Sequence, residues 1–222
     1  MAEENYDWHA HIERVMAKED TTQADIKDVY SGWSKTYEKT MVEDYGYQGP
    51  VVAVELLSQK LKEFGYSNDA RIVDLGCGTG LVGEQLWKNG YKNIDGVDLT
   101  PELLELAKAK EIYGSLKQGK MGSPQCKELG LEENRYDAAI CVGVFSVKHV
   151  PSKGFDDLLY VVKPGGLACC SMREQALNDP KSTYQEKMEQ FCKDGKWKLI
   201  VKHHEPAYLK HDGAWFFVYQ IL

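Results

Sequence analysis

The chain has 222 residues, of which 43% are apolar and 27% are charged, and its formal net charge is −7. This length and composition are typical of one globular α/β domain whose core is large enough to fold without disulfides. The acidic balance argues against a nucleic-acid partner, because such proteins usually carry a basic face. No apolar run approaches the ~20 residues that a membrane-spanning helix needs.

The six cysteines include no Cys-x-x-Cys pair, and three of them, Cys141, Cys169 and Cys170, lie in strand-like apolar runs. A reduced cysteine in such a run acts as a small hydrophobic residue, which is typical of proteins from a reducing compartment. The first eleven residues are polar and acidic, unlike a secretory signal. We therefore expect a cytoplasmic protein, with a nuclear location also open and no membrane partner. The sequence does not indicate an oligomeric state.

Residues 1–50 are expected to form a helical and aromatic segment in front of a main domain at residues 51–222. Asp7–Glu19 has the composition of a short polar helix. Tyr30, Trp33 and Tyr37 follow at spacings of three and four, which is typical of one helix face. These aromatic residues could pack on the domain, form a lid over a binding site, or do both.

Helix-like and strand-like segments alternate from Pro50 onward, which predicts a parallel sheet with covering helices. Thr100 and Pro101 are typical of the cap and first turn of a helix. The last two strands have no helix between them and are expected to form an antiparallel hairpin with a turn near His211–Gly213. The expected strands are Arg71–Leu75, Ile94–Asp98, Leu116–Gln118, Tyr136–Val142, Leu167–Met172, Trp197–His203 and Ala214–Ile221, and the expected helices are Val51–Phe64, Leu81–Lys88, one from Pro101 and one containing Phe155 and Val162.

A glycine-rich loop, Val73-Asp-Leu-Gly-Cys-Gly-Thr-Gly80, lies between an expected strand and an expected helix. Glycine lets the chain turn tightly and lets a ligand approach the backbone, because no Cβ stands in the way. The following helix N-terminus offers unpaired N–H groups and a partial positive charge to an anionic ligand group. The loop therefore predicts a ligand-binding turn.

Asp98 lies at the end of the second expected strand, 22 residues after Gly76. A carboxylate in this position can accept hydrogen bonds from the two hydroxyls of a ribose. The alternative is a surface or helix-capping aspartate. The loop and Asp98 alone fit a nicotinamide-dependent oxidoreductase as well as they fit a methyltransferase.

Three motifs together resemble class I S-adenosylmethionine-dependent methyltransferases: Asp74-x-Gly-x-Gly-x-Gly80, Gly96-Val-Asp98 before Thr-Pro-Glu, and Val161-Val-Lys-Pro-Gly-Gly166. The aromatic run Tyr30–Tyr37 and the segment Leu75–Gly83 are similar to the Williams–Beuren-region methyltransferase-like group. The resemblance implies a doubly wound, seven-stranded, mostly parallel sheet in the order 3-2-1-4-5-7-6, with a C-terminal antiparallel hairpin and an N-terminal helical extension.

The resemblance also implies that S-adenosylmethionine is the cofactor and S-adenosylhomocysteine the product, with a small-molecule or protein acceptor that the sequence does not identify. Asp98 would bind the ribose, Leu99 would pack on the adenine, and Asp74 would help to receive the amino group. Lys120 stands where the family commonly has an aspartate for the adenine, so the backbone near Met121 is the alternative contact. The residues implied to bind the cofactor are Asp74, Gly76, Cys77, Gly78, Thr79, Gly80, Asp98, Leu99, Met121, Gly122, Val142, Val144, Tyr30, Trp33 and Tyr37.

Methyl transfer from a sulfonium is an in-line displacement, which needs alignment and needs a general base only if the acceptor arrives protonated. The candidate polar groups near the acceptor are Ser146 and His149, which follow the fourth strand. No metal site is expected, since the adjacent residues His203 and His204 of one strand point to opposite faces. The absence of an obvious base leaves open a non-catalytic S-adenosylmethionine-binding module that serves interaction.

Overall fold

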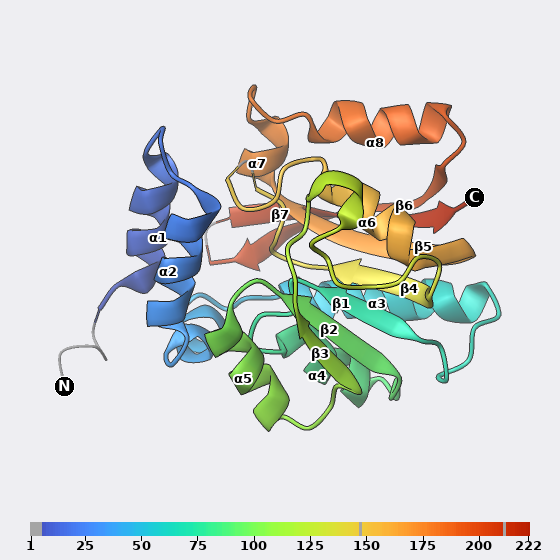
Figure 1. The fold of residues 1–222 in the computed structure, drawn as a ribbon, viewed down its shortest axis with the longest axis horizontal. Helices are drawn as coiled ribbons and strands as arrows, with labels where there is room; N and C mark the ends of the chain where they lie inside the picture. The colour runs from blue at the N-terminus through green and yellow to red at the C-terminus, as the bar shows by residue number, and fades with distance from the viewer. Residues whose placement is uncertain (1–5, 147, 211) are drawn as a thin grey trace.

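The computed structural model describes residues 6–146, 148–210 and 212–222. Its centre is a seven-stranded sheet in the order β3-β2-β1-β4-β5-β7-β6, which confirms the predicted fold class (Figure 1). The strands are β1 Ile72–Leu75, β2 Ile94–Asp98, β3 Ser115–Gln118, β4 Tyr136–Cys141, β5 Val162–Arg173, β6 Trp197–Leu209 and β7 Asp212–Ile221.

Helices cover both faces of this sheet, and two N-terminal helices, α1 and α2, stand together at one end of the strands (Figure 1). The glycine-rich loop leads from β1 directly into α4, as predicted. The helices are α1 Trp8–Ala17, α2 Gln23–Trp33, the π-helix η1 Lys39–Asp44, α3 Gly49–Glu63, α4 Leu81–Lys88, α5 Pro101–Ala109, the 3-10 turn η2 Pro124–Cys126, α6 Gly154–Val161, α7 Glu174–Asn178 and α8 Tyr184–Lys193.

The strand pairing explains where the predicted boundaries are wrong. Strands β1 to β5 run parallel, whereas β7 pairs antiparallel with both β5 and β6. Strand β5 begins at Val162 rather than at Leu167, because Val162 already pairs with Tyr136 before an irregularity in the register. Strand β6 continues past His203 to Leu209 across a second irregularity. It forms the edge of the sheet. Proline has no backbone N–H to donate, and an edge strand tolerates Pro206 because one of its sides has no neighbouring strand to bond.

Two further sequence expectations need correction or fall outside the structure. Thr100 occupies the N-cap position of α5, but its side chain makes no capping hydrogen bond. Its backbone N–H instead donates to Asp98 Oδ1 at 2.8 Å. The expected hairpin turn includes His211, which lies outside the described residues.

The hydrophobic core has two parts, one on each face of the sheet. Successive residues of a strand point to opposite faces, so Ile72 belongs to one part and Val73 to the other. The part containing Ile72 also includes Ile12, Ile26 and Trp33 from the N-terminal helices. These helices therefore share a core with the sheet. Within the described ranges, no helix combines the length and apolarity that crossing a membrane requires.

Candidate cofactor and acceptor site

The glycine-rich loop is held against β2 at the carboxyl end of the parallel strands. The N–H groups of Gly76 and Cys77 both donate to the Val97 carbonyl, at 2.8 and 3.0 Å. Gly76 and Gly78 have φ angles of +75° and +53°, which other residues rarely adopt. A Cβ on Gly76 would lie 2.3 Å from Val144 Cγ2, whereas a Cβ on Gly78 would meet open space. Gly76 thus permits close packing, and Gly78 leaves its backbone open to a ligand.

Asp98 joins this loop to the start of α5. Its Oδ2 accepts from the Gly78 N–H at 2.9 Å, and its Oδ1 accepts from the Thr100 N–H at 2.8 Å. Burial raises the pKa of the carboxyl, and these backbone hydrogen bonds counteract part of that rise. Each carboxylate oxygen can accept a second hydrogen bond. The geometry therefore fixes the carboxylate and leaves it able to accept hydrogen bonds from a ligand.

Asp74 occupies a different environment behind the loop. It is fully buried, and its Oδ2 accepts from the Tyr113 hydroxyl at 2.8 Å. Its Oδ1 has no hydrogen-bond partner among the described residues. Burial raises its pKa to about 7, although the bond from Tyr113 lowers it. The Tyr113 ring packs against the end of the loop and the first turn of α4, since a Cβ on Gly80 would lie 3.2 Å from the ring and one on Gly83 would lie 2.3 Å from the hydroxyl. The sequence interpretation missed Tyr113, which no local motif marks.

A cavity of about 140 Å³ opens beside Asp98 at the carboxyl ends of β1, β2 and β4. Most of the residues predicted to bind a cofactor line it, and helix α2 contributes wall residues that were not predicted. The predicted residues in its wall are Gly76, Gly78, Asp98, Leu99, Met121, Val142, Val144, Tyr30 and Tyr37, and the unpredicted ones include Gln23, Ile26, Lys27, Leu103, Gly143 and Val150.

The other predicted cofactor residues lie elsewhere. Gly122 and Trp33 line a second, larger cavity, and Trp33 is only 1% exposed. The remaining four residues lie behind the loop or within it and line neither cavity. These four are Asp74, Cys77, Thr79 and Gly80.

The loop after β3 forms another side of the smaller cavity. Lys120 and Met121 both line it, and the Lys120 N–H donates to the Glu128 carbonyl at 2.8 Å. The N–H of Gly122 donates to Oδ2 of Asp157, a fully buried residue of α6, at 2.6 Å. Burial raises the pKa of Asp157 to about 6. Asp157 thus anchors this loop through a contact between residues 35 positions apart, which sequence reasoning missed.

The second cavity has a volume of about 1150 Å³, and its wall combines aromatic side chains with charged ones, which are Glu13, Glu19, Lys120, Lys148, Arg173, Asp179 and Lys181. It shares seven wall residues with the smaller cavity, so the two spaces are contiguous. The shared residues are Gln23, Tyr30, Tyr37, Lys120, Met121, Gly143 and His149. The aromatic residues of the larger cavity are Tyr30, Trp33, Tyr37, Tyr47, Phe145 and Tyr208.

Ser146 and His149, the candidate polar groups after β4, lie together at this boundary. Ser146 Oγ is 2.7 Å from His149 Nδ1. The Nε2 atom of His149 is shielded from solvent and has no partner among the described residues. Burial lowers the pKa of this histidine to about 4, so its imidazole is neutral near pH 7. The His149 carbonyl accepts from Gln23 Nε2 of α2 at 2.6 Å.

Two tyrosines stand over the end of β4. The Tyr208 hydroxyl donates to the Tyr47 hydroxyl at 3.2 Å, and their rings meet edge to face with centroids 5.2 Å apart. A Cβ on Gly143 would lie 2.6 Å from the Tyr47 hydroxyl. The Gly143 N–H donates to Ser171 Oγ at 3.0 Å. The glycine therefore lets a pair of phenol hydroxyls approach the backbone next to the shared wall.

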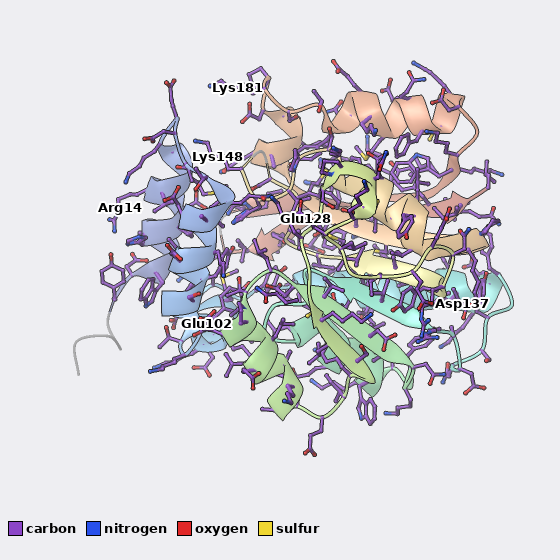
Figure 2. The ribbon with its side chains drawn as sticks, in the orientation of Figure 1. Arg14, Glu102, Glu128, Asp137, Lys148 and Lys181 are labelled. Carbon is purple, nitrogen blue, oxygen red and sulfur yellow. The ribbon has the colours of Figure 1, made fainter. Side chains whose placement is uncertain are left out.

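Polar contacts tie the N-terminal segment to the rest of the chain around these cavities. Arg173 of β5 forms an ion pair with Glu13 of α1 at 2.8 Å. The Ser31 hydroxyl of α2 donates to Glu102 of α5 at 2.9 Å. Figure 2 shows Glu102 at the boundary between α5 and the N-terminal helices, whereas Asp137 lies at the opposite end of the strands. The helices are thus attached on the side where the cavities lie.

A methyltransferase-domain family model matches residues 72–166, which include the glycine-rich loop and Asp98. The CurJ carbon methyltransferase shares the fold with a TM-score of 0.59 at 13% identity, over 90% of this chain and 59% of that one. The chain belongs to the class I S-adenosylmethionine-dependent methyltransferases.

Within that class, the chain is similar to human methyltransferase-like protein 27, with 33% identity over 173 residues. The match covers 78% of this chain and 68% of the human protein. The ubiquinone biosynthesis O-methyltransferase of Xylella fastidiosa strain M23 is 27% identical over 131 residues, which are 56% of this chain. The chain thus matches about half of that enzyme's length, 50%.

Proposed function

We propose that this protein binds S-adenosylmethionine beside Asp98, in the smaller cavity and the adjoining end of the larger one, and transfers its methyl group to an acceptor held in the rest of the larger cavity. The observation that carries the proposal is the position of Asp98, whose carboxylate is fixed beside an open glycine turn in the wall of the smaller cavity. The family membership supports the reaction, and the contiguous cavities support two adjacent ligands.

The residues around Asp98 fit this cofactor. The second hydrogen-bonding position on each Asp98 oxygen suits ribose hydroxyls. Leu99, Leu103 and Met121 offer apolar surface for an adenine ring, and the open backbone at Gly78 suits the methionine part. The bound cofactor supplies a methyl group on a positively charged sulfur, which is a good leaving group.

The protein's own contribution is alignment, exclusion of water and placement of a proton acceptor. Alignment of two reactants can supply roughly 7–11 kcal/mol of a barrier. Tyr30 and Tyr37 belong to both cavity walls and limit access of water at the boundary. His149, neutral near pH 7, is the residue we assign to accept a proton, and Ser146 orients it.

We further propose that residues 1–50 act as the cover of this site and that residues 51–222 form the cofactor-binding domain. The support is that Gln23, Ile26 and Tyr30 of α2 line the smaller cavity while the domain supplies its other walls. The acceptor is a small molecule or an exposed group of a protein. A cavity of this volume suits either.

Calorimetric titration with S-adenosylhomocysteine tests the proposal. The intact protein should bind it, and Asp98→Ala should weaken binding roughly 10- to 100-fold, because hydrogen bonds to a charged group contribute about 1.5–3 kcal/mol. Asp69→Ala, at an exposed position outside both cavities, is the matched control and should bind normally. Unchanged affinity in Asp98→Ala, or no binding by the intact protein, would contradict the assignment.

A further inference from the structure

The starting observation is the incomplete hydrogen bonding of His149. This residue belongs to the walls of both cavities, yet its Nε2 is shielded from solvent and unpartnered among the described residues. Buried polar atoms normally have a partner, and one that lacks it in a cavity wall calls for an explanation. Ser146 Oγ lies 2.7 Å from Nδ1, and in the neutral tautomer in which it accepts the Nδ1 proton, Nε2 carries a free lone pair.

The two charged groups closest in effect to His149 are paired with each other, although Lys120, Lys148 and Lys181 also belong to the wall of the larger cavity. The charged groups whose fields reach its imidazole are Arg173 and Glu13, and these two form an ion pair with each other at 2.8 Å. Arg173 also lies 3.5 Å from Asp212. With its guanidinium already shared by two carboxylates, Arg173 has little capacity for an anionic acceptor. The Glu13 carboxylate is likewise engaged and offers little to an ammonium group.

The aromatic lining defines the shape and the hydrogen-bonding character of the ligand. The aromatic side chains of Tyr30, Tyr37 and Phe145 line the larger cavity and favour a flat apolar body. The Tyr47 hydroxyl, which accepts from Tyr208 beside the end of β4, can donate its own proton to an oxygen. A thiol would use this hydroxyl poorly, since sulfur is a weak acceptor and S–H a weak donor.

The weak basicity of His149 distinguishes a hydroxyl acceptor from an alkylamine acceptor. A hydroxyl that receives a methyl group becomes a strong acid as the new bond forms, so even a weakly basic imidazole removes its proton. An alkylamine that receives a methyl group becomes an ammonium with a pKa of ~10, near that of lysine, and keeps its proton against such a base. A weak base at the shared wall can therefore take the proton of a hydroxyl acceptor during transfer, whereas it cannot take the proton of an alkylamine acceptor.

We propose that the methyl acceptor is an aromatic molecule carrying an un-ionised hydroxyl group, and that His149 Nε2 removes the hydroxyl proton during transfer. The acceptor oxygen uses a lone pair to form the new bond to the methyl carbon. The carbon–sulfur bond breaks, and its electron pair stays on the sulfur. The hydroxyl proton goes to Nε2, and the imidazolium returns it to water. This inference rests on the proposed function.

The experiment compares three probes with the same ring system, 2-naphthol, naphthalen-2-ylmethanamine and naphthalen-2-ylmethanethiol, with methyl-labelled S-adenosylmethionine and the full chain. The same preparation is first titrated with S-adenosylhomocysteine, so that a failure of cofactor binding is recognised separately as a failure of the proposed function. We expect 2-naphthol to be methylated at least roughly tenfold faster than the other two, since the amine gains nothing from the base and the thiol sulfur accepts only weakly from the Tyr47 hydroxyl.

Two variants link the preference to the named residues. His149→Gln should lower kcat for 2-naphthol about 100-fold, the low end of general-base effects, while binding S-adenosylhomocysteine normally. His203→Gln, at a side chain 43% exposed on β6 and outside both cavities, is the matched control and should keep its rate. Tyr47→Phe keeps the ring and removes one hydroxyl, and should weaken calorimetric binding of 2-naphthol to the S-adenosylhomocysteine complex.

Preferred methylation of the amine or the thiol would overturn the inference. So would an undiminished rate in His149→Gln, or the absence of transfer to all three probes by a preparation that binds S-adenosylhomocysteine. If His149→Gln shows no thermal unfolding transition, it is not folded and the inference is tested on Tyr47→Phe instead. Unchanged binding of 2-naphthol by Tyr47→Phe would then contradict the inference.

Discussion

At the scale of single residues, the site combines groups that a local motif reveals with groups that only the fold brings together. Asp98 and the glycines of the loop could be predicted, because the strand end and the spacing both mark them. Tyr113 and Asp157 could not, since they act on Asp74 and Gly122 from 39 and 35 positions away in the sequence. Nothing in the sequence near either residue indicates such a contact.

The buried carboxyl of Asp74 predicts a pH dependence of stability. Its pKa is raised to about 7 in the folded protein, above the ~3.9 of an unfolded chain. Between these values the unfolded chain has released the proton that the folded one still holds, so this group lowers stability as pH rises from about 4 to about 7. Asp74→Asn should therefore show a smaller fall in Tm than the native chain between pH 5 and pH 8.

Circular dichroism melts of both proteins across this range check the prediction, with the exposed Asp69→Asn as control. The lowered pKa of His149 acts in the opposite direction between about 4 and 6.5, and it is common to all three proteins. The comparison between variant and native chain therefore isolates Asp74. If Tm falls by the same amount in Asp74→Asn and in the native chain, the prediction is contradicted.

Glycine substitutions separate backbone strain from crowding. Gly65 and Gly76 both have positive φ angles, but a Cβ on Gly65 meets no atom within 4 Å, whereas one on Gly76 lies 2.3 Å from Val144. Gly65→Ala should cost about 1–2 kcal/mol of unfolding free energy from strain alone. Gly76→Ala should cost a further ~1–3 kcal/mol from overpacking. Urea unfolding measures both, and equal losses would show that crowding at Val144 is unimportant.

At the scale of secondary-structure elements, boundaries were predicted well where a local signal and the tertiary structure agree. Helix α4 and strand β2 have the predicted limits, because glycine or a turn residue ends each one. Strand β5 begins earlier than predicted, since pairing with β4 overrides the turn preference of Pro164 and Gly165. Helices α7 and α8 were not predicted, although Thr183 and Glu186 have the spacing of a capping box at the start of α8; the Thr183 side chain makes no capping hydrogen bond there.

The position of the N-terminal helices predicts that ligand binding slows amide hydrogen exchange mainly in these helices. Residues of α2 line the smaller cavity, and α1 is connected to the site through the Glu13–Arg173 ion pair. Binding of S-adenosylhomocysteine should therefore slow amide hydrogen exchange in α1 and α2, by roughly tenfold if closure is stabilised by about 1.4 kcal/mol. Mass spectrometry of peptides from these helices measures it, with β7 as the internal reference. Equal protection of β7 and the two helices would argue against a cover.

At the scale of the whole molecule, the N-terminal segment is part of one packed body. Its residues Ile12, Ile26, Val29, Trp33 and Met41 belong to the same hydrophobic cluster as the sheet. Periodicity in the sequence indicated a helix face, but it could not show whether that face packs on the domain, because packing depends on a distant surface.

Removal of residues 1–44 should therefore destabilise the remaining chain. Each fully buried apolar side chain contributes about 1.5–3 kcal/mol, and the partners of the removed residues would become exposed. A loss of several kcal/mol in a chain of this size lowers Tm by roughly 10 °C or more. Differential scanning fluorimetry of the shortened and full chains measures the shift. A shortened chain that melts within 2 °C of the full chain would show that the segment contributes little to the fold.

The shared wall formed by Tyr30, Tyr37 and His149 has a consequence for how two ligands influence one another. A displacement of these side chains by one occupant alters the surface offered to the other, so the two occupancies are thermodynamically linked. Such linkage is mutual: if one bound ligand changes the affinity for the other by some factor, the other changes the affinity for the first by the same factor. The methyl donor and the methyl acceptor would then each change the affinity of the protein for the other through these three side chains.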